Sequence, residues 1–76
     1  MTIYVIIIED RHTDVEVLAY TRLEAAIREA KKQATDLCRF PEDYEENDTG
    51  APGWKFYARY SCEGGSVHVV EVEVRA

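Results

Sequence analysis

The sequence is short of basic residues. Nine lysines and arginines stand against fifteen aspartates and glutamates, which leaves a formal net charge of −6. Nucleic-acid binding needs a basic surface that displaces phosphate counterions, so the charge argues against direct nucleic-acid binding, and it disfavours anionic membranes for the same reason. The protein partner that this charge favours is one with a basic surface.

Long apolar runs are also missing. The longest one, at residues 3–8, is too short to span a membrane, and it lacks the basic flank of a signal peptide. We therefore expect a cytoplasmic protein that makes no membrane contact. The two cysteines, Cys38 and Cys62, form no CxxC pair, and in this compartment we expect reduced thiols.

Motifs of catalysis and metal binding are likewise few. The only histidines, His12 and His68, and the two cysteines are solitary, whereas zinc ligands usually occur in pairs a few residues apart. No phosphate-binding glycine loop and no serine-nucleophile motif are present. We predict a protein without cofactor, metal or catalytic residues. One alternative stays open, because one register of the last hairpin would place Cys62 beside His68, as in a cysteine-dependent enzyme or a metal binder.

The length of 76 residues is enough for one hydrophobic core and thus one domain, residues 1–76. Its 46% hydrophobic content is that of a globular protein. We predict an α+β domain of ββαββ order, with a four-stranded, mostly antiparallel sheet and one helix packed on one face. Its parts are a hairpin at 3–20, a helix at 21–38, an acidic loop at 40–53 and a hairpin at 54–75.

The first strand and the helix have the clearest patterns. Residues 3–9 are β-branched or aromatic on both alternating faces, which is typical of a central strand. Thr21 and Glu24 have the spacing of a capping box, and Pro41 should end the helix by about residue 39. Between them, apolar residues recur every three or four positions: Leu23, Ala26, Ile27, Ala30, Ala34 and Leu37.

The second hairpin turns at residues 63–66, which contain two glycines. A two-residue turn would place Phe56 opposite Glu73 on the same face. We therefore predict a three-residue loop with a left-handed glycine, or a bulge. Either one aligns the face that holds Trp54, Phe56, Ala58, Tyr60 and Cys62 with Val70, Val72 and Val74.

The first half of the chain, in which two strands precede Thr-Arg-Leu-Glu-Ala-Ala-Ile-Arg-Glu-Ala, resembles the N-terminal half of HicB-like antitoxins. In that family a strand pair also runs into a helix of the Thr-x-x-Glu-Ala type, although its strand count before the helix differs. The resemblance implies an antitoxin-like regulator and no particular site residues. Size and charge also match small phage proteins that inhibit host defence proteins.

The acidic loop is the main candidate site. Residues 38–53 hold five acidic residues and one arginine, so they carry −4 of the net charge of −6. We predict a non-catalytic, small acidic protein-binding module that presents this loop to a basic partner. The alternative is a small homo-oligomeric accessory protein whose loop only aids solubility. Calcium is disfavoured, because an EF-hand-like spacing from Asp43 would put Asp48 where glycine is required. The predicted partner-binding residues are Glu42, Asp43, Tyr44, Glu45, Glu46 and Asp48.

The sheet provides a second candidate surface. One helix covers one face of a four-stranded sheet, so the other face would expose more apolar surface than a small monomer usually does. That face holds either Tyr4, Ile6 and Ile8 or Ile3, Val5 and Ile7, and loop 40–53 could cover it. We predict instead that a second copy does, which makes the protein a homodimer.

Overall fold

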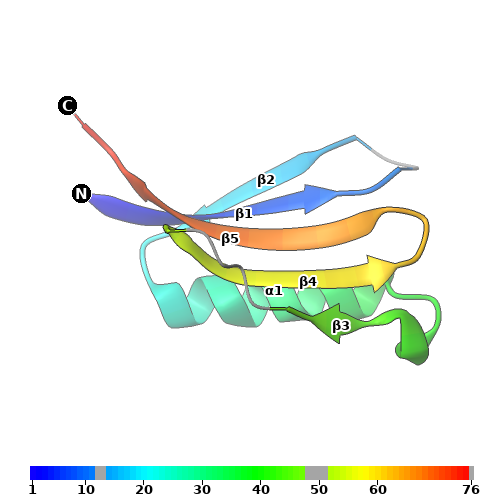
Figure 1. Ribbon diagram of the computed structural model, residues 1–76. Helices are drawn as coiled ribbons and strands as arrows, with labels where there is room; N and C mark the ends of the chain where they lie inside the picture. The colour runs from blue at the N-terminus through cyan, green and yellow to red at the C-terminus, as the bar shows by residue number, and fades with distance from the viewer. Residues whose placement is uncertain (12–13, 48–51, 76) are drawn as a thin grey trace.

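The computed structural model describes residues 1–11, 14–47 and 52–75. One α-helix packs against one side of an antiparallel sheet, which confirms the α+β prediction (Figure 1). The sheet has five strands, one more than predicted, because the acidic loop contributes a short strand. The elements in chain order are β1 (Thr2–Glu9), β2 (Glu16–Tyr20), α1 (Leu23–Leu37), the 3-10 turn η1 (Pro41–Asp43), β3 (Glu45–Glu46), β4 (Trp54–Ser61) and β5 (Gly65–Glu73).

The strands lie in the order β2-β1-β5-β4-β3, and every neighbouring pair is antiparallel. β1 is an inner strand between β2 and β5, as its two apolar faces predict. The two hairpins are joined where β1 pairs with β5, with Ile6 opposite Val69. The sheet thus combines both halves of the chain around one core.

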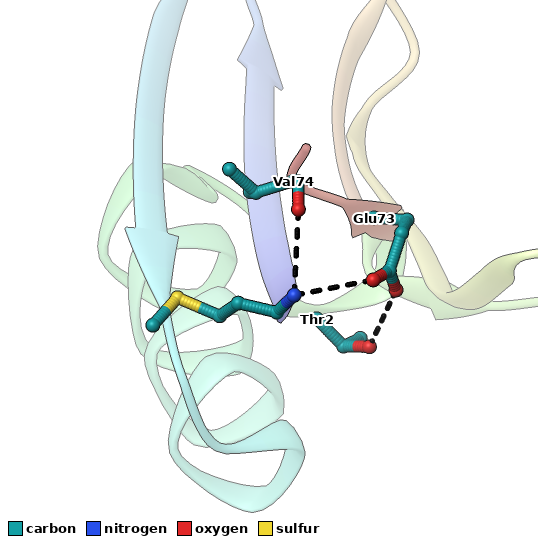
Figure 2. A network of polar contacts seen from close by, with 4 residues as sticks. Thr2, Glu73 and Val74 are labelled. Atoms are coloured by element: carbon teal, nitrogen blue, oxygen red, sulfur yellow. Dashed lines mark hydrogen bonds and ion pairs between the residues drawn. The ribbon is translucent and has the colours of Figure 1, made fainter. Parts of the chain in front are cut away.

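The pairing of β1 with β5 brings the two ends of the described chain together (Figure 2). The amino group of Met1 lies 3.2 Å from Glu73 Oε1 and donates to the carbonyl of Val74 at 3.3 Å. The hydroxyl of Thr2 donates to Glu73 Oε2 at 2.9 Å. All of these groups are exposed, so the contacts contribute little to stability.

The turn of the second hairpin is a three-residue loop, residues 62–64, as predicted. Gly64 adopts a φ of +103°, which residues with a side chain rarely adopt. Gly65 is needed for a different reason: a Cβ there would lie 2.5 Å from the ring of Tyr60. The ring therefore packs directly on the backbone of β5.

The faces of this hairpin differ from the prediction. A register shift between Trp54 and Phe56 sets three residues of β4 against two of β5. The bulge turns Trp54 to the opposite face from Phe56. Phe56 and Ala58 therefore lie opposite Val69 and Val67, and the predicted alignment with Val70, Val72 and Val74 is wrong.

The predicted capping box is also wrong. The helix begins at Leu23, its N-cap is Arg22, and no side chain caps it. A capping box needs threonine at the N-cap and glutamate at the third helical position. Thr21 instead precedes the N-cap and Glu24 is the second helical residue, so the reciprocal bonds cannot form. The helix ends at Leu37, as Pro41 predicts, and the Cys38 N–H donates to the Ala34 carbonyl at 3.0 Å.

The core lies between α1 and the sheet. Three alanines of α1 are fully buried, and their small side chains let the helix approach the strands closely. In the described part of the chain, no helix is long and apolar enough to cross a membrane. We call the helix-facing side of the sheet the covered face; its buried residues are Ile6, Ile8, Phe56, Ala58, Tyr60, Val67 and Val69.

Candidate interaction surfaces

The side of the sheet away from α1 is mostly apolar, and among the described residues no helix or strand covers it (Figure 1). The register pairs Ile3 with Val72 and Val5 with Val70, and these residues alternate with those of the covered face. Val17 is 59% exposed and Val72 is 38% exposed. We call this side the open face; it comprises Ile3, Val5, Ile7, Val17, Ala19, Trp54, Tyr57, His68, Val70 and Val72.

Charges lie at one end of the open face. Glu9 and Arg59 are both register partners of Ser66, and Glu45 of β3 is the partner of Arg59. The rest of the face carries valines, isoleucines and aromatic rings, with the exposed Lys55 at the β4 bulge beside Trp54.

An aromatic cluster occupies the open face around His68. Its ring centroid lies 4.7 Å from that of Trp54 and 4.9 Å from that of Tyr57. His68 Nε2 and Ser66 Oγ are 3.2 Å apart. Burial lowers the pKa of His68, and the charge of Glu9 opposes that shift. The sequence analysis missed this cluster, because simple alternation places Trp54 on the other face.

The structure does not bring Cys62 and His68 together. His68 pairs with Tyr57, and Cys62 is exposed in the three-residue loop. Both cysteines are free thiols. Among the residues that the structure describes, no three histidine, cysteine or acidic side chains gather as metal ligands. His12 lies outside those residues.

Part of the predicted acidic loop has regular secondary structure. Its first residues form η1, the helical turn that Pro41 followed by acidic residues favours. Two glutamates then form β3, where Glu45 pairs with Arg59 and Glu46 with Ala58. Residues 41–47, the part of the loop before the undescribed residues, therefore run along the edge of β4 and do not cover the open face.

Of the predicted partner-binding residues, Glu42, Glu45 and Glu46 are exposed and Asp43 is half-buried. Glu46 Oε1 lies 3.5 Å from Lys31 Nζ on the helix. Asp48 lies outside the described residues. The structure thus places four of the five carboxylates along one edge of the molecule.

Tyr44 is half-buried and packs against the core from the side of β4. Burial is the main cause that raises the pKa of its hydroxyl, followed by the charge of Glu46. The side chain therefore fixes the acidic segment to the domain.

The hollows in the described surface are small. One of about 140 Å³ lies between the end of α1 and the second hairpin, where Asp10, Phe40 and Tyr60 contribute to its lining. Another, of about 260 Å³, is lined by Thr35, Cys38, Pro41 and Tyr44. Ligand pockets usually have volumes of about 300–1,000 Å³. Both of these hollows are smaller.

Comparisons with family models, with curated proteins and with solved structures found no match.

Proposed function

We propose that the protein is a non-catalytic protein-binding module that forms a homodimer through its open face and presents its acidic segment, residues 42–48, to a basic partner. The observation that carries this proposal is the uncovered apolar face of the sheet. Contiguous apolar surface of this kind marks interaction sites in small proteins. Trp54 and Tyr57 supply the aromatic side chains that most often anchor such sites.

Its apolar character makes the open face the surface through which a second copy can bind. The chain carries a net charge of −6, so two copies repel one another over most of their surfaces. Most of the open face is apolar, its charges being those at one end and Lys55 at the β4 bulge, and two such faces can stack as two sheets of a sandwich. The described part of segment 40–47 lies along β4 instead, so it does not compete for this surface.

The size of the face sets the expected affinity. The strands contain 32 residues in all, which at a rise of about 3.3 Å per residue and a spacing of about 4.8 Å between strands cover roughly 500 Å². Two such faces would bury about 1,000 Å² in total, which is near the lower limit for specific interfaces. We therefore expect a dimer that dissociates on dilution through the micromolar range.

Light scattering over a concentration series tests the dimer. The parent should approach twice the chain mass of 8.7 kDa at high concentration. Val72→Glu, on the open face, should stay monomeric, because a dimer would bury its charge. Leu37→Glu is the matched control: Leu37 is 39% exposed, like Val72, but lies at the end of α1. A parent at 8.7 kDa throughout, or dissociation by both variants alike, would refute this arrangement.

The acidic segment favours a basic partner because η1, Tyr44 and β3 hold the four carboxylates of residues 42–46 in place. In the described chain, no ion pair joins Glu42 or Glu45 to a basic group. Fixed and unneutralised charges of one sign accelerate association with a surface of the opposite sign. The segment can therefore steer a basic partner onto one edge of the sheet.

An oligo-arginine peptide serves as the probe for this function. One variant carries amides at Glu42, Asp43, Glu45, Glu46 and Asp48; a control carries amides at Asp14, Glu16, Glu24, Glu29 and Asp36. Both lose five charges, so only the position differs. The first should lose most of its affinity through a slower association rate, while the control should keep the parental rate within a few-fold. Equal losses would show that the segment acts only through net charge and aids solubility.

A further inference from the structure

His68 lies near the middle of the open face, and its neighbours come from three strands. Ile7 of β1 and Tyr57 of β4 are its register partners. The rings of Trp54 and Tyr57 lie 4.7 and 4.9 Å from the imidazole, and Ser66 of β5 lies 3.2 Å from its Nε2. Any partner that covers the open face must therefore also cover an imidazole that is already partly buried.

We propose that His68 makes self-association through the open face depend on pH, so that the dimer forms with neutral imidazoles and dissociates when they take up protons. This inference rests on the proposed function, because it requires the open face to join two copies. It adds a regulatory property that the apolar surface alone does not supply.

The groups that face His68 do not offer strong compensation for a positive charge. From β1 they are Ile7 and Glu9. From β4 they are Trp54, Lys55 at the bulge, Tyr57 and Arg59, with Glu45 beyond Arg59. Glu9 favours the imidazolium, yet burial outweighs it, and the pKa of His68 is lowered. A second copy would bring the same apolar residues and a second His68. Covering the imidazolium would remove more water and leave its charge without a close partner.

The direction of the pH effect follows from the order of the pKa values. In the free chain the pKa of His68 is already below its ordinary value of 6.5. Covering by a second copy lowers it further, so the dimer binds fewer protons than two separate chains. Association is therefore fully favourable at neutral and higher pH and is lost as the pH falls below 6.5 towards the lower pKa of the dimer.

Sedimentation velocity at pH 8, 7, 6 and 5.5 tests this inference on the full chain. The parent should show the same dimer Kd at pH 8 and 7 and a Kd several-fold weaker at pH 5.5. His68→Phe keeps an aromatic ring that cannot titrate, and His68→Gln removes the ring; both should lose the pH dependence, whatever their Kd. His12→Asn removes the only other histidine and should behave like the parent.

The outcomes separate this inference from the proposed function. A parent that dimerises with the same Kd at every pH would refute the inference and leave the homodimer standing. A parent that is monomeric even at pH 8 would refute both. Parental pH dependence in the folded His68 variants, checked by circular dichroism, would assign the effect to another group and refute the inference.

Discussion

The covered and open faces of the sheet are built from the same strands, and both are apolar, yet they pack differently. Ile6 and Ile7 are neighbours on β1: Ile6 is fully buried under α1, while Ile7 remains half-exposed on the open face. Ala26, Ala30 and Ala34 bring α1 close to the covered face. The helix therefore creates the difference between the faces, and apolar character alone does not.

Replacing the two neighbouring isoleucines compares the faces with the same change of side chain. Ile6→Ala should lower the free energy of unfolding by about 2–5 kcal/mol, because it leaves a cavity under the helix. Ile7→Ala should cost clearly less in dilute solution, where the open face is uncovered, and should weaken the dimer instead. Urea denaturation at low protein concentration measures both. Equal losses for the two variants would mean that the open face is packed as tightly as the covered one.

Enlarging a small residue on each face probes how closely that face is packed. Gly65→Ala would place its Cβ 2.5 Å from the Tyr60 ring, so we expect a loss of about 1–3 kcal/mol. Ala19→Val enlarges an exposed side chain on the open face and should leave stability unchanged or slightly higher. Thermal unfolding of both proteins provides the measurement. A Gly65→Ala protein as stable as the parent would show that the ring has room to shift.

Removing the hydroxyl groups of the β4 tyrosines should reveal a smaller difference in stability between the two faces. The Tyr60 hydroxyl donates to Asp10 Oδ2 at 2.6 Å, whereas Tyr57 lies on the open face. Tyr60→Phe should cost about 1 kcal/mol and Tyr57→Phe almost nothing in the monomer. Urea denaturation at pH 7 measures both.

The same hydrogen bond gives a pH dependence at high pH. Burial, followed by the bond to Asp10, raises the pKa of Tyr60 above its ordinary value of 10. The Tyr60 hydroxyl therefore makes its full contribution to the free energy of unfolding below pH 10. This contribution is lost as the pH rises from 10 towards the pKa of the folded state. The gap between the parent and Tyr60→Phe should narrow above pH 10. A gap that is constant up to pH 11 would contradict the assignment.

Local sequence signals predicted the element order, the helix stripe and its end before Pro41, and the turn at Gly64. These features depend on residues close together in the chain, so periodicity and turn chemistry suffice. The faces of β4 could not be predicted, because the bulge at Lys55 depends on how β4 pairs with β5. The pair of glutamates in β3 has little strand propensity, and it joins the sheet through tertiary pairing with Arg59 and Ala58 of β4.

Some residues of the candidate interaction surfaces could be predicted from the sequence and others could not. Its acidic residues could be named from composition, since charge clusters are visible without a structure. The aromatic cluster of Trp54, Tyr57 and His68 could not, because it exists only once the bulge turns Trp54 onto the open face. Which set of isoleucines stays uncovered likewise depends on the side of the sheet on which α1 packs.

Trp54 reports on the open face without any label. It is the only tryptophan of the chain, is 37% exposed and lies against His68. If two open faces join, Trp54 should be shielded from acrylamide at high protein concentration at pH 8 and become more accessible on dilution. Val72→Glu should show the diluted behaviour at every concentration, and Leu37→Glu should follow the parent. Quenching that is equally strong in the parent at all concentrations would show that no second copy covers this face.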